Sequence, residues 1–241
     1  EAQVNVAIQV AEQMSDFLLN GAVTNALNMP SISAEDAPRL KPYMALAEQL
    51  GSLAGQITGD AIKSVNIEYE GSVAELNLKP LTAIIMAHLL KVQLDNVNMV
   101  NALRVAEARG IEISETKTGS SQDFRSLITV TVVTEKREHI AAGTLFTGKE
   151  PRIVNIDGVP IEAALASHML YIRNEDKPGL IGGLGTILAE AGQNIADFRL
   201  GRVGRDETAV ALVALDEALS DELFEKIQAL PQIRQVQRLK F

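Results

Sequence analysis

Few side chains in this 241-residue chain have the types and spacings that support catalysis. There is no cysteine, which excludes disulfides, thiolate metal sites and cysteine nucleophiles. The three histidines, His88, His139 and His168, lie far apart and form no pair with metal-ligand spacing. The glycines from Gly179 to Gly185 follow Pro178 and lack the spacing of a phosphate-binding loop, so we interpret them as positions that allow a helix to pack closely on a sheet. The residues therefore favour a binding or regulatory module over a catalyst.

One group of basic residues could bind an anion. Arg109, Lys117 and Arg125 lie close in sequence, and clusters of Arg and Lys are typical of phosphate recognition. The alternative is a solvated face of mixed charge, which is favoured because Glu107 and other glutamates interleave with the basic residues. Both readings stay open at this point.

The histidines have simpler structural readings. His88 lies between Ala87 and Leu89 in an apolar stretch, which predicts a packed core histidine. His139 follows a charged segment, which predicts an exposed position in a turn. His168 begins a predicted strand, and we interpret it as a polar residue of an edge strand, with a supporting role in ligand binding as the alternative.

The composition excludes several classes of protein. With 22 Lys+Arg against 31 Asp+Glu the net charge is −9, which disfavours nonspecific nucleic-acid binding. Aromatic residues are only 4% and Trp is absent, which disfavours base-stacking surfaces. No apolar run approaches the roughly 18 residues that span a bilayer, and no basic segment precedes an apolar one as in a signal peptide. We therefore expect no membrane partner and a cytoplasmic location.

The first two thirds of the chain alternate between helical and strand-like periodicity. Apolar residues at spacings of three and four predict helices over 1–20, 40–54, 76–92 and 98–110. A loop is predicted at 28–31, and Ser33 is a suitable N-cap for the helix that follows. Alternating residues predict strands over 64–69 and 111–117, and β-rich runs predict strands over 125–134 and 139–146. Two further strands, over 152–156 and 159–161, are predicted on either side of Asp157-Gly158, which is typical of a two-residue hairpin turn.

The last third has the clearest pattern. Strands are predicted over 168–173, 194–203, 208–215 and 233–241, with helices over 178–191 and 220–230 and a turn at 204–207. This order, βαββαβ, is the ferredoxin-like motif. The chain is therefore predicted to be an α+β protein in which an α/β domain precedes a ferredoxin-like one.

The motifs of the last third resemble the ACT domain family. A strand and polar loop ending in Pro178-Gly179 precede a helix, and Gly192-Gln-Asn-Ile195 follows that helix. Upstream, the segment from Glu1 to Pro30 resembles the end of the catalytic core of the long-form D-3-phosphoglycerate dehydrogenase family. Residues 33–164 resemble that family's intervening, or allosteric substrate-binding, domain through Ala108-Arg-Gly110 and Asn155-Ile-Asp-Gly158, together with Asn101 and Ala102.

This resemblance implies a division into three parts. Residues 1–33 correspond to a remnant of the dehydrogenase core, 34–164 to the intervening domain and 165–241 to the ACT domain. The family's nucleotide-binding domain and its catalytic His, Arg and Glu would lie before Glu1. We therefore expect the C-terminal part of such an enzyme, with no catalytic residue, no metal site, no cofactor in this chain and no dehydrogenase activity alone. NAD would be the cofactor of the full-length enzyme.

The resemblance also implies an effector site. Asn174 and Asp176 stand where serine-regulated members have His and Asn, and Asn194 matches directly. Amides and a carboxylate can bind both the ammonium and the carboxylate of an amino acid. These residues are also typical of turns and strand starts, which is the structural alternative. Asn194 is expected to point back toward the loop at 174–176.

The same resemblance implies the binding partners of the chain. Effector sites of this kind lie between paired ACT domains, so self-association through this domain is implied, with L-serine or a similar amino acid as ligand. A phosphorylated substrate is a second candidate ligand, at the intervening domain. A free-standing amino-acid-sensing module is the alternative function. A serine dehydratase would share both regulatory domains, but it needs cysteines for an iron–sulfur cluster, and the match over Glu1–Pro30 argues against it.

Overall fold

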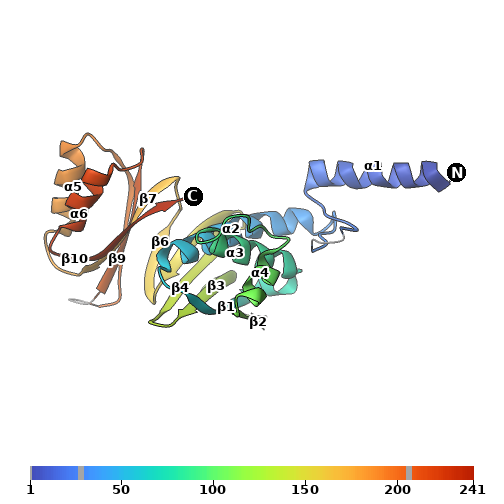
Figure 1. Ribbon diagram of the computed structural model, residues 1–241, viewed down its shortest axis with the longest axis horizontal. Helices are drawn as coiled ribbons and strands as arrows, with labels where there is room; N and C mark the ends of the chain where they lie inside the picture. Colours follow the sequence, from blue (N-terminus) through green and yellow to red (C-terminus); the bar gives the residue numbers. More distant parts are fainter. Residues whose placement is uncertain (1, 27–29, 205–207) are drawn as a thin grey trace.

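The computed structural model of the chain describes residues 2–26, 30–204 and 208–241. Part of the loop predicted at 28–31 and most of the turn predicted at 204–207 lie outside these residues. The architecture is α+β, with two separate sheets and six α-helices in the described part (Figure 1). The predicted fold class is therefore confirmed.

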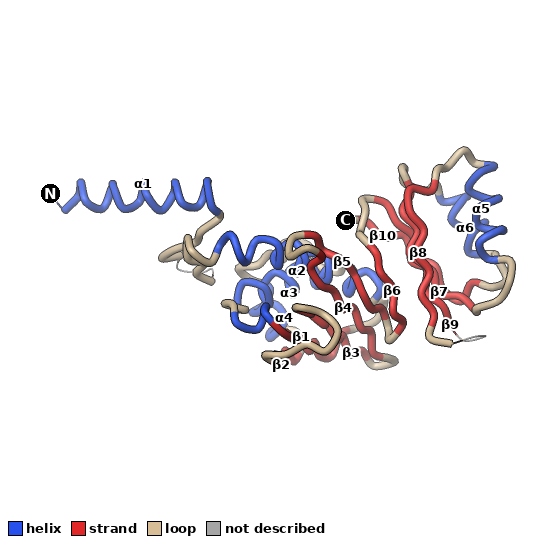
Figure 2. The backbone as a smooth tube through the Cα atoms, turned by 180° about the vertical axis from the view of Figure 1, so that it is seen from behind, coloured by secondary structure: helices blue, strands red, loops and turns tan. Residues whose placement is uncertain are grey.

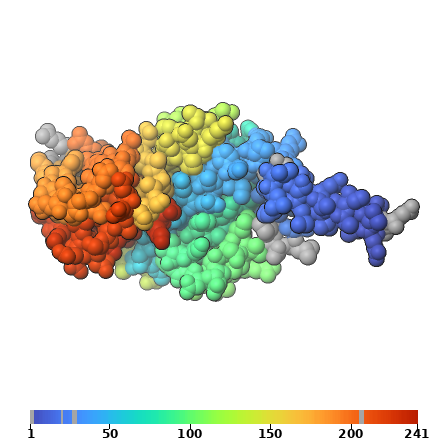
Figure 3. All heavy atoms as spheres, turned by 90° about the horizontal axis from the view of Figure 1, so that it is seen from above, coloured from blue at the N-terminus to red at the C-terminus, as the bar shows by residue number. Residues whose placement is uncertain are grey.

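The first helix, α1 (Ala2–Asn20), stands clear of the rest of the molecule (Figure 3). Its apolar stripe was predicted from three- and four-residue spacing, yet Ile8, Met14 and Leu18 are all exposed. The chain then crosses a short antiparallel bridge between Val23 and Ile32 before the next helix begins.

A six-stranded sheet forms the middle domain, in the order β2-β1-β3-β4-β5-β6. Strands β1 and β2 are parallel, and the other neighbours are antiparallel. The strands are β1 (Ile62–Gly71), β2 (Glu112–Thr118), β3 (Ser126–Thr134), β4 (Glu138–Phe146), β5 (Glu150–Ile156) and β6 (Val159–Ala163). Asp157 and Gly158 both have positive φ (50° and 81°), which confirms the predicted hairpin turn between β5 and β6.

Helices cover one face of this sheet. They are α2 (Ala37–Ile57), α3 (Lys79–Lys91) and the short α4 (Ala102–Ala108). A 3₁₀ turn at Ser72–Glu75 precedes α3. Ser33 does not cap α2 directly, but its hydroxyl accepts from the N–H of Asp36 at 3.0 Å in the preceding turn. Side chains such as Leu50, Ile67 and Ile85 are fully buried between the helices and the sheet.

The C-terminal unit is a four-stranded antiparallel sheet in the order β10-β7-β9-β8. Its elements follow the predicted βαββαβ order: β7 (His168–Glu175), α5 (Leu180–Glu190), β8 (Ile195–Arg202), β9 (Thr208–Leu215), α6 (Asp221–Gln228) and β10 (Ile233–Lys240). Helices α5 and α6 cover the outer face of this sheet, which is the face turned away from the middle domain (Figure 2). Leu184, Ile227 and Ile172 pack together in the resulting core.

The inner face of the C-terminal sheet packs against the middle domain. Tyr171 and Leu212 belong to the same apolar core as Ile156 and Val159 of the middle domain. Gln56 of α2 adds two hydrogen bonds to the peptide of Lys240, at 3.0 and 2.8 Å. The two domains are therefore joined by both apolar and polar contacts.

Two of the three histidine predictions were wrong, and the third holds only in part. His139 is 2% exposed, because it lies within β4, with Nδ1 3.3 Å from the carboxylate of Asp157, rather than in a turn. His168 begins β7, which pairs with both β10 and β9 and is not an edge strand. His88 lies on α3 but is only half-buried, because it lines an open groove rather than the packed core.

The glycines of α5 were predicted to allow close packing on the sheet. Only Gly183 meets that description in part, since a Cβ there would lie 2.9 Å from Leu230, at the end of α6 rather than on the sheet. Nothing lies within 4 Å of the equivalent position at Gly182 or Gly185.

Candidate functional site

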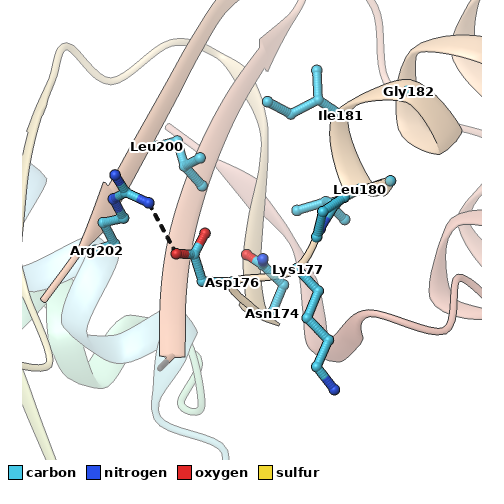
Figure 4. Close-up of a pocket in the computed structure, with 10 residues that line it drawn as sticks. Asn174, Asp176, Lys177, Leu180, Ile181, Gly182, Leu200 and Arg202 are labelled. Atoms are coloured by element: carbon cyan, nitrogen blue, oxygen red, sulfur yellow. Dashed lines mark hydrogen bonds and ion pairs between the residues drawn. The ribbon is translucent and has the colours of Figure 1, made fainter. Parts of the chain in front are cut away.

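A pocket of about 330 Å³ lies at one end of the C-terminal sheet. It is bounded by the end of β7, the first turn of α5 and the end of β8 (Figure 4). Its lining comes from two segments that are about 20 residues apart in sequence. The lining residues are Asn174, Asp176, Lys177, Pro178, Gly179, Leu180, Ile181, Gly182, Leu200 and Arg202.

Asn174 is the buried polar group of this pocket. Its side chain points toward the helices because it alternates along β7 with Arg173, which faces the other side. The amide nitrogen donates to the carbonyl of Glu175 at 2.8 Å. The amide oxygen is buried and has no hydrogen-bond partner among the described residues. A buried acceptor without a donor is costly, so this atom favours a ligand that can donate to it.

Asp176 and Arg202 form the charged part of the pocket. The Arg202 guanidinium lies 3.0 Å from the carboxylate of Asp176, and both groups stay partly exposed (Figure 4). A solvated pair of this kind stabilises the fold little, so either group can exchange its partner for a ligand at low cost. Together they offer a carboxylate for an ammonium group and a guanidinium for a carboxylate.

The turn between β7 and α5 positions these groups. Gly179 adopts a left-handed conformation (φ 111°) directly before α5, so the chain reverses sharply after Pro178. The first N–H groups of a helix have no partner within the helix, and those of α5 open on the pocket beside Ile181 and Gly182. The Glu175 carboxylate pairs with Lys177 and, at 3.1 Å, with Arg234, and hydrogen bonds from these two residues lower the pKa of its carboxyl.

Asn194 lies at the opposite end of the C-terminal sheet from the pocket. The register aligns Arg202 and Asn174 with Ala209, whereas Ile195, next to Asn194, aligns with Leu215 at the other end of β9. The Asn194 amide donates to the carboxylate of Asp216 at 2.8 Å. The expectation that Asn194 points back toward Asn174 and Asp176 of its own chain was therefore wrong.

The residues of the predicted anion site do not all converge. Lys117 and Arg125 lie at one end of the six-stranded sheet, near the end of β2 and the start of β3. Arg109 lies before β2 begins, so the length of that strand separates it from Lys117. At about 3.3 Å per residue this separation is on the order of 20 Å. Arg109 is therefore not part of one site with the other two.

His168 is also remote from the pocket. It lies at the start of β7, paired with Lys240, whereas Asn174 lies at the end of the same strand. His168 is not among the residues that line the pocket, so the supporting role in effector binding considered for it has no structural support in this chain.

Among the described residues, no three His, Asp or Glu side chains gather as a metal site would require. None of the described helices combines the length and apolar character needed to cross a membrane.

Arg202 is the pocket residue that sequence reasoning missed. It ends β8, about 26 positions after Asp176, and no local motif connects the two. The predicted βαββαβ order did hold a usable signal, because in that fold the first and second strands run in the same direction and end at the same edge of the sheet.

Comparison with known proteins divides the chain in the same way as its two sheets. Residues 39–157 match the family described as the D-3-phosphoglycerate dehydrogenase intervening domain, and residues 168–232 match the ACT domain family.

Three similar whole proteins are named D-3-phosphoglycerate dehydrogenase. The D-3-phosphoglycerate dehydrogenase of Synechocystis sp. is 36% identical over 242 residues, covering 100% of this chain and 44% of the relative. Those of Bacillus subtilis and Archaeoglobus fulgidus are 33% and 35% identical, covering 97% and 95% of this chain and 45% and 44% of the relatives. This chain thus spans less than half the length of the proteins that it resembles.

Proposed function

Because this chain carries the intervening and ACT domains of the D-3-phosphoglycerate dehydrogenase family, we propose that it is the regulatory part of such an enzyme. The regulatory signal in this proposal is a small amino acid, with L-serine as the first candidate. The ligand binds in the pocket formed by Asn174, Asp176 and Arg202 of the ACT domain.

The observation that carries this proposal is the unpartnered amide oxygen of Asn174 beside an exchangeable ion pair. An α-amino acid presents an ammonium group and a carboxylate close together. The Asn174 oxygen and the Asp176 carboxylate can accept from the ammonium, while Arg202 can donate to the carboxylate. A hydroxyl on the ligand side chain can use the N–H groups at the start of α5.

A second copy of the chain would complete this pocket. Strand β8 is an edge of its sheet, and antiparallel pairing of two β8 strands about a two-fold axis brings the start of one beside the end of the other. In that arrangement Asn194 of a second copy approaches Arg202, at the level of Asn174. The effector role of Asn194 is therefore retained as a proposal only for a dimer.

The remaining assignments belong to the whole enzyme of which this chain would be a part. We propose NAD-dependent oxidation of 3-phosphoglycerate, in serine biosynthesis in the cytoplasm, as that enzyme's activity. This chain alone would supply no catalytic residue and hold no NAD. A phosphorylated substrate bound near Lys117 and Arg125 remains a second proposed effector. A free-standing amino-acid-sensing module is the alternative function.

Titration calorimetry of the purified chain with L-serine tests the proposal. The Asp176→Asn variant should bind about 1.5–3 kcal/mol more weakly, the usual contribution of a hydrogen bond to a charged group. Asp221→Asn is the matched control, because Asp221 also pairs with an arginine of the ACT domain, Arg238, but far from the pocket. Equal affinity in Asp176→Asn, or no binding of L-serine and other small amino acids, would contradict the assigned site.

A further inference from the structure

The end of strand β7 carries two different polar sites on its two faces. Asn174 faces the effector pocket, with Asp176 in the loop just beyond, whereas Tyr171 and Arg173 face the intervening domain. On that second face the nearest partner is Asp157, in the turn between β5 and β6. A displacement of this strand end would therefore alter both sites together.

Asp157 is surrounded by groups from both domains. One oxygen, Oδ1, accepts from the N–H of Ile140 at 2.9 Å. The other, Oδ2, faces Nδ1 of His139 at 3.3 Å and the guanidinium of Arg173 at 3.6 Å. His139 belongs to the intervening domain and Arg173 to the ACT domain, so this single carboxylate spans the boundary. Its side chain is only 9% exposed.

The two contacts of Oδ2, at 3.3 and 3.6 Å, are long for a buried carboxylate. Charge-assisted hydrogen bonds usually measure about 2.7–2.9 Å, shorter than both contacts of Oδ2. The Nδ1 of His139 and the hydroxyl of Tyr171 are buried and have no hydrogen-bond partner among the described residues. The charge of Asp157 helps to raise the pKa of the Tyr171 phenol, after burial as the main cause. Two unpaired groups thus lie beside a carboxylate with capacity to accept from them.

We propose that Asp157, His139, Tyr171 and Arg173 form an interdomain latch that tightens when the end of β7 moves toward the β5–β6 turn. A small displacement would shorten the two long contacts and give the tyrosine hydroxyl a partner. A ligand on the opposite face of the same strand end would favour or oppose this displacement, because it rests on Asn174 and Asp176. This regulatory part of the inference rests on the proposed function of the pocket.

The charged and titratable groups packed around the latch come from several elements. Arg137 lies in the β3–β4 turn, close enough for its charge to act on Tyr171. Gln235 of β10 bridges toward Arg137 at 3.5 Å. Asp60, just before β1, acts on Arg137 and His139 through its negative charge. Among the described residues, Asp157 is the acid that lies within ion-pair distance of Arg173.

Spin-label distance measurements test the latch in the intact chain. The sequence has no cysteine, so Glu107→Cys on α4 and Glu225→Cys on α6 can be labelled selectively on two exposed positions, one in each domain. Asp157→Asn removes the charge yet keeps a residue that tolerates the left-handed turn. Asp123→Asn, exposed in the intervening domain, is the matched control.

The distance distribution should broaden by about twofold or more in Asp157→Asn, because the substitution weakens one of the contacts that fix the two domains relative to each other. Arg173→Gln, which alters a partly exposed side chain of the ACT domain, should broaden it similarly. Asp123→Asn should leave the wild-type distribution unchanged. A distribution in Asp157→Asn that superimposes on that of the wild type would overturn the latch, as would broadening in Asp157→Asn without any in Arg173→Gln.

The same labelled proteins separate this inference from the proposed function. Saturating L-serine should shift the distribution of the wild type and not that of Asp157→Asn, and its dissociation constant should differ between them by about fivefold or more. Equal dissociation constants and equal shifts would overturn the coupling. If neither protein binds L-serine or another small amino acid, the proposed function and the coupling both fail, whereas the ligand-free distances still decide the latch.

Discussion

At the scale of single residues, Asp157 makes the stability of the chain sensitive to acid. Burial alone would raise the pKa of this carboxyl, but the neighbouring His139, the hydrogen bond from the N–H of Ile140 and the positive charge of Arg173 outweigh it. The pKa in the folded state therefore lies below the ordinary 3.8. Such a group stabilises the fold above its unfolded pKa, and this stabilisation disappears as the pH falls through the folded value.

We therefore expect the wild type to exceed Asp157→Asn in free energy of unfolding at about pH 7 and to lose that advantage toward about pH 3. Urea titrations of both proteins at several pH values measure the difference. A difference that stays constant down to the lowest pH would show that the ionised carboxylate is not its source.

Lys117 and Arg125 allow a prediction about the intervening domain at the same scale. Both lie at one end of the six-stranded sheet, whereas Arg109 lies at the other. If an anion binds there, Lys117→Gln and Arg125→Gln should each weaken binding of 3-phosphoglycerate by about 1.5–3 kcal/mol, as for hydrogen bonds to charged groups. Arg109→Gln serves as the charge-matched control and should bind normally. Equal weakening in all three variants would indicate a general effect of net charge instead.

The pocket shows how far single residues could be predicted from sequence. Asn174 lies at the end of β7 and Asp176 just beyond it, shortly before Pro178-Gly179, a local pattern that fixes where the strand ends and the loop begins. Asn194 and Arg202 depend instead on the direction and register of β8, which local spacing does not report. The burial of His139 likewise depends on its pairing with Val132 across two strands, and not on its charged neighbours in sequence.

At the scale of elements, helices α2 and α3 pack unusually closely, and glycine permits it. A Cβ at Gly55 would lie 2.5 Å from the carbonyl oxygen of Leu89 and 2.8 Å from the side chain of Val92. Gly55→Ala should lower the free energy of unfolding by about 1–3 kcal/mol, the usual cost of overpacking. Chemical denaturation measures this change.

Gly185→Ala in α5 is the control for that experiment, because nothing lies within 4 Å of its Cβ position. Without a clash, replacing glycine by alanine inside a helix should raise the free energy of unfolding by roughly 0.5–1 kcal/mol. The two substitutions are chemically identical and should differ in sign. Stabilisation by both would mean that the α2–α3 interface can relax.

Periodicity predicted the elements better than their arrangement. The strand predicted over 208–215 and the hairpin turn predicted at Asp157-Gly158 are both present in the structure. The helix predicted over 76–92 begins only at Lys79, because the preceding residues form a separate 3₁₀ turn and a loop. Sheet order and the packing of the two domains depend on contacts between residues that are distant in sequence. A pattern within a short stretch of sequence does not report such contacts.

At the scale of the whole molecule, two apolar surfaces remain exposed in the described residues. One is the length of α1, where Leu18 and Leu19 are the most exposed. The other surrounds the edge of the ACT sheet, where Leu200 of β8 lies near Ile181 of α5. Exposed apolar residues beside an open sheet edge are typical of an association surface. The second surface also borders the effector pocket, so association there would enclose the ligand.

Self-association through β8 is the prediction that follows, and a charge at Leu200 should prevent it. Leu200→Asp places a carboxylate in the proposed interface and should raise the dimer dissociation constant by about tenfold or more, because burying an unpaired charge is costly. Leu103→Asp on α4 is the matched control, since Leu103 is 42% exposed and Leu200 is 41% exposed. Sedimentation equilibrium over a range of concentrations compares the two variants with the wild type. A dimer that persists in Leu200→Asp would place the contact on another surface, of which α1 is the first candidate, and Asn194 of a second copy could then not reach the pocket.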